Sequence, residues 1–261
     1  MAWRALCRRY GDKGRRPIAR GWIDGFIGIL IFSGSLPATR IAVSGLDPVF
    51  LTTARAAIAG VIAAAILIVF RAERPGPRAL VQLVVIALGV VVGFPLFTAL
   101  ALTRVTAAHS VVFLGLLPLA TAAFGVMRGG ERPRPAFWLF ACLGSALVAG
   151  VSMAGRVAAG PLGGLLLLVG VLVCALGYAE GAQLSRKLGG WQVISWALVL
   201  SLPVMAPLAL VTMPPAPAAV APAAWAGLGY VALFSMLIGF IFWYRGLAAG
   251  GVATVGQLQL L

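Results

Sequence analysis

The sequence predicts an all-α polytopic membrane protein, built from helices that cross a lipid bilayer many times. Of its 261 residues, 62% are hydrophobic and only 10% are charged, and the mean hydropathy is +1.06. Soluble domains carry about 25% charged residues, so this chain has too little polar surface to cover a water-exposed globule. The second observation is that uncharged apolar runs of about 20 residues, the length of a membrane span, recur along the chain.

Eight runs are long enough to cross hydrocarbon about 30 Å thick at about 1.5 Å per helical residue. They are Trp22–Val43, Val49–Phe70, Ala79–Ala101, His109–Met127, Ala136–Ala154, Leu162–Gln183, Trp191–Thr212 and Ala223–Tyr244. A basic segment, residues 1–21, precedes the first run, which is too long for the apolar core of a signal peptide. A further run, Val252–Leu261, is too short to cross as a helix, which favours a truncated chain over a half-helix.

The Lys and Arg residues predict how the chain is oriented, because they gather on the cytoplasmic side of membrane proteins. With the N-terminus inside, sixteen of the 20 basic residues lie in inner segments and only Arg104 and Arg156 lie in outer loops. Arg40 and Arg55 remain within the spans. The net charge of +14 is therefore interpreted as a topology signal. Nucleic-acid binding is not expected, because no separate basic domain is left over.

The chain also contains an internal repeat with an offset of 145 residues. Residues 87–116 and 232–261 share six identities in 30 positions. The offset spans five predicted helices, an odd number, so the second copy would enter the membrane upside down, as in many transporters. The predicted repeats are residues 22–154 and an incomplete second copy, residues 162–261. Prolines that bend or interrupt helices are expected at Pro37, Pro95, Pro118 and Pro203.

Four segments resemble a known family: Ala99–Leu119, Gly130–Arg132, Gly177–Leu198 and Tyr244–Leu261. They are similar to the EamA family of the drug/metabolite transporter superfamily, over about residues 25–261. The resemblance implies ten helices in two inverted five-helix repeats, of which this chain holds eight and part of a ninth. It also implies a place in the bacterial inner membrane, with export of small metabolites, amino acids or drug-like compounds.

Two carboxylates are notable in so apolar a chain. An ionisable side chain in the middle of a membrane helix costs about 2.5–3.5 kcal/mol on insertion scales, so each is a candidate functional residue. Glu180 is interpreted either as a proton or cationic-substrate site, or as a carboxylate that reaches the inner interface and pairs with Arg186. Glu131, in a charged inner loop, is expected to pair with Arg128 or Arg132.

Two arginines lie within predicted spans: Arg40 near the outer end of the first, and Arg55 one to two turns into the second. A guanidinium there can hold the carboxylate of an anionic or zwitterionic substrate by paired hydrogen bonds. The alternative is a structural role, either pairing with Asp47 or reaching the outer surface. The structural role is favoured for Arg40, and both interpretations stay open for Arg55.

Three further residues complete the predicted substrate or ion pathway. His109, the only histidine, is either a pH sensor or a local hydrogen-bonding group at a helix start. Tyr178 lies beside Glu180 in the same apolar run. Trp243 belongs to an aromatic set at the inner end of the last full span, expected first as an interface belt and second as cavity lining.

A secondary transporter for a small-molecule substrate is the function that the sequence favours, and proton coupling stays open. A lipid-modifying membrane enzyme is the first alternative, but six carboxylates and one histidine, scattered along the chain, are a poor catalytic inventory. A membrane protein without transport activity is the second. ATP-driven pumping is disfavoured because the sequence has no P-loop motif. No cofactor or metal site is expected, since Cys7, Cys142 and Cys174 lie far apart.

Overall fold

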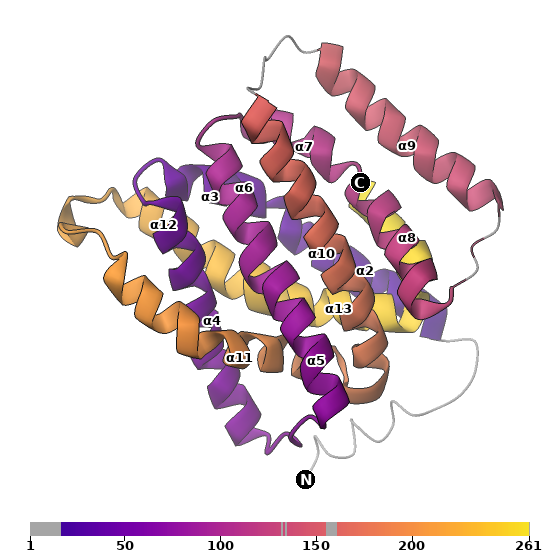
Figure 1. The fold of residues 1–261 in the computed structure, drawn as a ribbon, viewed down its shortest axis with the longest axis horizontal. Coiled ribbons are helices and arrows are strands. Elements are labelled where there is room, and N and C mark those ends of the chain that lie inside the picture. Colours follow the sequence, from indigo (N-terminus) through magenta and orange to yellow (C-terminus); the bar gives the residue numbers. More distant parts are fainter. Residues whose placement is uncertain (1–16, 132, 134, 155–160, 261) are drawn as a thin grey trace.

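The computed structural model describes residues 17–131, 133, 135–154 and 161–260, which form a bundle of helices without strands (Figure 1). Within these residues, six helical stretches are long and apolar enough to cross a membrane by length and composition. The predicted class, an all-α polytopic membrane protein, is confirmed. The helices are α2 (Pro17–Ser33), α3 (Ser35–Val43), α4 (Pro48–Val69), α5 (Pro77–Ile86), η1 (Ala87–Gly93), α6 (Phe94–Leu102), α7 (Ala107–Leu114), α8 (Leu117–Gly129), α9 (Pro135–Ala154), α10 (Pro161–Leu188), α11 (Gly190–Val211), η2 (Pro217–Ala219), α12 (Pro222–Tyr230), η3 (Val231–Ile238), α13 (Gly239–Gly250), α14 (Val252–Gly256) and η4 (Gln257–Leu260).

Several boundaries differ from the sequence prediction, and two of them have a clear local cause. Helix α2 begins at Pro17 rather than Trp22, because proline suits the first turn of a helix, where its missing N–H would be unbonded anyway. The last five residues of the predicted basic segment are therefore helical, and residues 1–16 lie outside the described part of the chain. Helix α10 continues to Leu188, whereas the predicted span ends at Gln183. Gly189, at φ +91°, ends it in a backbone conformation that glycine adopts readily.

Four of the spans are interrupted near their middle. The first breaks at Gly34 between α2 and α3, and the fourth breaks between α7 and α8. The third and the last full span each change into a π-helix, η1 and η3 respectively, before continuing as α6 and α13. Such segments inside α-helices are frequently found at functional sites.

Proline lies close to three of these interruptions, at Pro37, Pro95 and Pro118. Each stands in the first turn of the helix that follows the break, where it removes a backbone donor that would have continued the previous helix. Helix α11 behaves differently. It runs without interruption through Pro203 and Pro207, so the predicted break at Pro203 is not found.

Several elements recur along the chain with the offset of 145 residues. The offset places the first residue of η1, Ala87, on Ala232 in η3. It also places the start of α6 on the start of α13, and the start of α7 on the start of α14. The π-helical segment is therefore repeated, whereas the break at Gly34 is not, because the offset places Gly34 on Ala179 inside the continuous α10.

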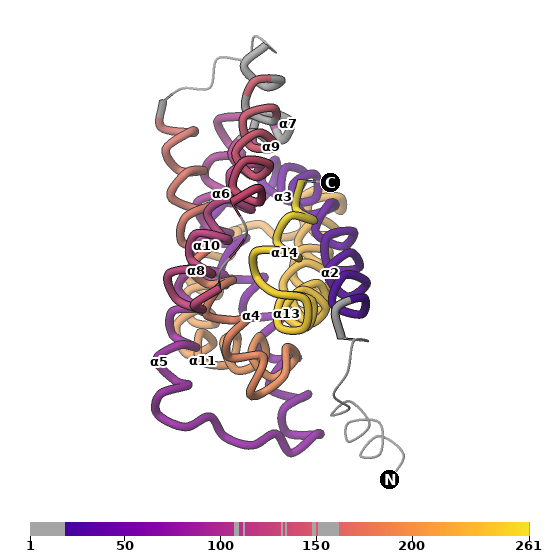
Figure 2. Tube along the Cα trace, turned by 90° about the vertical axis from the view of Figure 1, so that its right-hand side faces the viewer, coloured from indigo at the N-terminus to yellow at the C-terminus, as the bar shows by residue number. Residues whose placement is uncertain are grey.

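Helices α2 and α13 pack side by side along their length (Figure 2). Glycines make this contact possible: a Cβ atom at Gly21 would lie 2.6 Å from the Gly250 nitrogen, and one at Gly246 would lie 2.6 Å from the Gly25 nitrogen. Both helices thus carry two glycines four residues apart. This small-xxx-small pattern allows backbones to approach closely where lipid provides no hydrophobic driving force.

The bundle has two distinct ends and an apolar flank. Figure 2 shows the α4–α5 connection at one end and helices α3 and α7 toward the other. Helix α9 lies at the edge of the bundle in Figure 1 and exposes large apolar side chains, among them Leu139, Phe140 and Leu147. An apolar outer surface of this kind suits contact with lipid chains.

Candidate functional site

A cavity of about 340 Å³ lies at the level where the interrupted spans change helix type. Its lining includes residues on either side of two breaks, Ser33 and Ser35, and Leu114 and Leu117. It also includes residues in and just after the two π-helices, Val90 and Phe94, and Ser235 and Phe240. Non-helical backbone at membrane depth is tolerated where it is buried in protein or lines a cavity. The helix breaks and the cavity are therefore parts of one arrangement.

The repeat offset relates five pairs of described lining residues. The pairs are Ser33 and Tyr178, Val90 and Ser235, Pro95 and Phe240, Leu114 and Gln259, Gly115 and Leu260. A cavity with such paired walls lies between the two halves of the chain. Substrate sites of transporters with internal repeats lie at the same place, near the middle of the bilayer between the repeats.

Most of the cavity wall is apolar, with aromatic rings from Phe32, Phe94 and Phe240. Ligand sites combine such walls with a small number of polar groups that fix orientation. Among the described lining residues, Arg55 is the charged one, and the uncharged polar ones are Ser33, Ser35, Thr39, Thr98, Tyr178, Ser235 and Gln259.

The Arg55 side chain is only 6% exposed, although it carries a full charge. Its Nη2 donates to Ser235 Oγ at 3.3 Å, and Ser35 Oγ donates to the same oxygen at 2.8 Å. Arg55 Nε is buried without a hydrogen-bond partner, and no carboxylate of the described residues forms an ion pair with this guanidinium. A buried charge is normally paired, so this arrangement is costly for the protein alone.

Glu180 lies outside the cavity and is held by two side chains from other helices. Its carboxylate is 1% exposed and accepts from Arg128 Nε at 2.5 Å and from Gln82 Nε2 at 2.9 Å. The alternative pairing with Arg186 is not found. These contacts join α10 to the end of α8 and to α5, about two turns before the end of α10.

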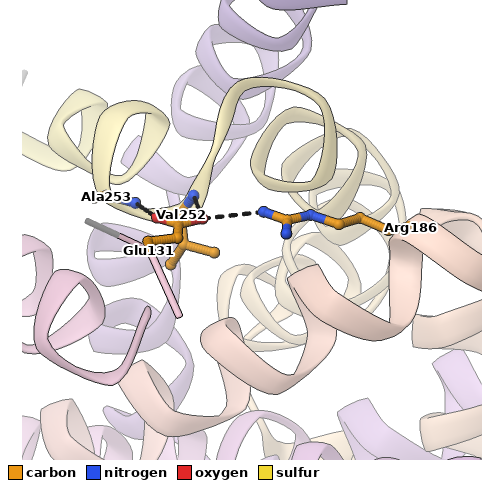
Figure 3. A network of polar contacts seen from close by, with 4 residues as sticks. All are labelled: Glu131, Arg186, Val252 and Ala253. Atoms are coloured by element: carbon orange, nitrogen blue, oxygen red, sulfur yellow. Dashed lines mark hydrogen bonds and ion pairs between the residues drawn. The ribbon is translucent and has the colours of Figure 1, made fainter. Parts of the chain in front are cut away.

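Glu131 binds Arg186 and the start of α14 instead of the expected Arg128 (Figure 3). Arg186 Nη2 donates to Glu131 Oε1 at 3.0 Å, and the backbone nitrogens of Val252 and Ala253 donate to the carboxylate at 2.9 Å each. A carboxylate at a helix N-terminus satisfies unbonded N–H groups and faces the positive end of the helix dipole. The predicted pairing of Glu131 with Arg128 is wrong, and Arg132 lies outside the described residues.

A third ion pair joins the closely packed α2 and α13, where Arg245 Nη2 lies 3.2 Å from Asp24 Oδ2. The three pairs thus link α8 with α10, the loop after α8 with α10, and α2 with α13. All lie toward the helix ends that the positive-inside rule predicts to be cytoplasmic.

The other predicted pathway residues lie in different places. Tyr178 lines the cavity and packs edge-on against Trp243, with ring centroids 5.5 Å apart. Trp243 is 0% exposed, so an interface belt is wrong for this residue, and it does not line the cavity directly. Arg40 Nη1 donates to the Leu102 carbonyl oxygen, outside the cavity lining. His109 belongs to α7, but its side chain is outside the described residues.

Asp47 does not pair with either of the two arginines within the spans. Its carboxylate accepts from the backbone nitrogens of Val49 at 2.8 Å and Phe50 at 3.1 Å, which caps the N-terminus of α4. The expected structural partner of Arg55 is therefore occupied elsewhere.

Sequence reasoning did not identify Ser235, Gln259 or Gln82 as candidate site residues. The sequence did contain a signal for Ser235 and Gln259. The repeat offset relates Ser235 to Val90 and Gln259 to Leu114, and all four line the cavity. Gln82 carries no comparable signal, because its role depends on which face of α5 meets Glu180.

The recurring π-helical interruption, the apolar exterior and the central cavity are typical of polytopic membrane transporters with internal repeats. The sequence profile of the EamA-like transporter family matches residues 20–153 and again residues 161–261. The chain belongs to the EamA-like transporter family.

Two known proteins can be compared with the chain as a whole. The chain is 64% identical over 241 residues to a Bacillus subtilis (strain 168) protein named "Uncharacterized transporter YdeK", covering 92% of this chain and 84% of that protein. It also resembles a solved chain described as "Crystal structure of protein", with a TM-score of 0.72 and 21% identity, covering 92% of this chain and 84% of the other. This second likeness concerns the fold alone.

Proposed function

We propose that the protein is a secondary transporter of the bacterial inner membrane that exports small metabolites, amino acids or drug-like compounds by alternating access. The observation that carries this proposal is the cavity between the two halves, lined by five residue pairs related by the repeat offset. In transporters built from repeats, one half moves against the other around a site at their interface. A cavity in that position can face each side of the membrane in turn.

The three ion pairs support a specific closed state. With the N-terminus inside, Arg128–Glu180, Arg186–Glu131 and Arg245–Asp24 all lie on the cytoplasmic side of the cavity. They hold α8 against α10, and α2 against α13. Opening the cavity to the cytoplasm then requires some of these pairs to separate, whereas the outer side lacks a comparable set among the described residues.

In this proposal Glu180 is part of the inner closure. Its carboxylate is engaged by Arg128 and Gln82, and it does not line the cavity. Proton coupling through Glu180 would require Arg128 to release the carboxylate during the transport cycle. Flux measured with Glu180→Gln at several pH values tests this step, because an unchanged pH dependence contradicts a proton role.

The experiment that tests the proposed function is flux through proteoliposomes that contain the purified chain. Vesicles loaded with a panel of radiolabelled neutral amino acids and small monocarboxylates are diluted into label-free buffer, with and without an imposed proton gradient. Saturable release above that of protein-free vesicles is the expected result. Release that never exceeds the protein-free rate for any compound contradicts the proposal, and a change with the gradient identifies proton coupling.

A further inference from the structure

The cavity has one highly polar corner, formed by Arg55, Ser235 and Ser35. These residues come from α4, η3 and α3, so three helices converge on the corner. The guanidinium is more than nine-tenths buried and belongs to the cavity lining. Its Nε has no partner among the described residues, although guanidinium nitrogens in proteins are normally hydrogen-bonded.

The hydrogen bonds of this corner leave mainly donors for a bound solute, with the Ser35 oxygen remaining as an acceptor. A serine hydroxyl has one donor hydrogen and two acceptor lone pairs. The Ser235 oxygen accepts from both Arg55 Nη2 and Ser35 Oγ, which uses both lone pairs. The Ser235 hydrogen is then left to donate. The unpaired Arg55 Nε–H is buried, so it can donate only where a bound solute displaces the side chains that cover it. A positively charged site with these donors suits a group that accepts hydrogen bonds.

The net charge of the cavity lining also favours an anionic solute. Arg55 contributes a positive charge, and no aspartate or glutamate occurs among the described lining residues of the cavity. A planar guanidinium matches a carboxylate by two parallel hydrogen bonds and also supplies the opposite charge. An ammonium group, in contrast, finds no carboxylate partner in this lining.

We infer that the cavity binds a small monoanionic solute, with its carboxylate on Arg55 and Ser235 and its apolar body against Phe32, Phe94 and Phe240. This inference rests on the proposed function and names the substrate class of the same site. The cavity volume of about 340 Å³ lies at the small end of ligand sites, so it suits compounds with one ring or a short chain. Zwitterions and cations of the same shape bind more weakly, because their ammonium group would be placed in this lining without a counter-charge.

The test uses four compounds with one shared apolar body: 3-phenylpropionate, its neutral amide 3-phenylpropionamide, phenylalanine and phenethylamine. Each is added to the detergent-solubilised full chain, and the shift in thermal unfolding is measured over a concentration series. The expected result is an apparent Kd for 3-phenylpropionate at least about tenfold lower than for the other three. Equal stabilisation by the amide, by phenylalanine or by phenethylamine overturns the inference, as does the absence of any shift.

Two variants separate charge recognition from structural effects. In Arg55→Gln the preference for the acid over the amide is expected to fall below about threefold, whereas in Ser235→Ala it weakens but persists. Arg104→Gln is the matched control, since Arg104 is exposed and donates to the Leu100 carbonyl oxygen outside the cavity. Each variant's own unfolding temperature is recorded without ligand, so loss of fold is recognised directly. An unchanged acid preference in Arg55→Gln overturns the inference.

Flux of the same four compounds distinguishes this inference from the proposed function. If the acid binds selectively but no compound crosses the vesicle membrane faster than in protein-free vesicles, the anion site stands and transport fails. If the amide or phenethylamine is transported faster than the acid, transport stands and the anion site fails.

Discussion

Val90 and Ser235 line the same cavity from two π-helical segments that lie 145 residues apart in the chain. The backbone is repeated, but the chemistry is not, because one position carries an isopropyl group and the other a hydroxyl. Leu114 and Gln259 differ in the same way. The repeat offset therefore relates part of the cavity wall, and individual substitutions give the cavity a polar side.

Replacing the two arginines in turn tests the importance of the cavity corner. We expect Arg55→Ala to reduce flux by about ten- to a hundredfold, since it removes charge-assisted hydrogen bonds worth about 1.5–3 kcal/mol. Arg40→Ala should have a smaller effect, because Arg40 donates to a carbonyl oxygen outside the cavity lining. Both are measured in proteoliposomes at matched protein content, and the reverse order would count against the position of the site.

The buried carboxylate of Glu180 gives a second prediction. Arg128→Ala leaves this 1% exposed group with Gln82 as its remaining partner, so thermal stability in detergent should fall by about 1–3 kcal/mol. Glu180→Gln combined with Arg128→Ala should lose less than the sum of the two single changes, because the pair is removed together. Simple additivity in this double-mutant cycle would show that the two side chains do not interact.

The α2–α13 contact predicts a sharp difference between two glycines. A methyl group at Gly246 would meet the Gly25 nitrogen at 2.6 Å, so Gly246→Ala should destabilise the protein by about 1–3 kcal/mol. At Gly229, on α12, a methyl group would have nothing within 4 Å, so Gly229→Ala should be neutral or slightly stabilising. Unfolding in a detergent series compares them, and equal effects would argue against close packing of α2 on α13.

Glu131 is expected to order the start of α14. Glu131→Ala removes the acceptor of the Val252 and Ala253 backbone nitrogens, a cap worth about 1 kcal/mol. Hydrogen exchange at these two amides should become about fivefold faster. Glu73→Ala, in the exposed α4–α5 connection, is the control and should leave them unchanged. No change in Glu131→Ala would mean that the cap is not stabilising.

The sequence predicted the class of fold well because lipid imposes simple rules on composition and helix length. The predicted spans overlap the observed helices, and the offset of the repeat matches the positions of η1 and η3. The positions at which the helices end were harder to predict. Helix α10 continues to Leu188 because Arg186 and Lys187 suit the negative end of a helix, whereas a hydropathy pattern treats them as loop.

The candidate site was predicted less completely, for a physical reason. Single residues such as Arg55 and Glu180 are notable because charge is expensive in a membrane, but sequence does not give their partners. Arg128 pairs with Glu180 and Arg186 pairs with Glu131, the reverse of the expected partners. The pairing depends on how the loop after α8 lies against α10 and α14, which the sequence does not give. Helix rotation likewise decided that Trp243 is buried and Tyr178 lines the cavity.

The central claim is that solute passes through the cavity between the repeats, and a matched pair of bulky substitutions tests it most directly. Leu114 lines the cavity, whereas Leu139 on α9 is 59% exposed at the bundle edge. Flux is measured in proteoliposomes for Leu114→Trp and Leu139→Trp, with unfolding temperatures recorded for both. We predict that Leu114→Trp blocks flux while Leu139→Trp transports like the unmodified chain. A folded Leu114→Trp protein with undiminished flux would contradict passage through this cavity.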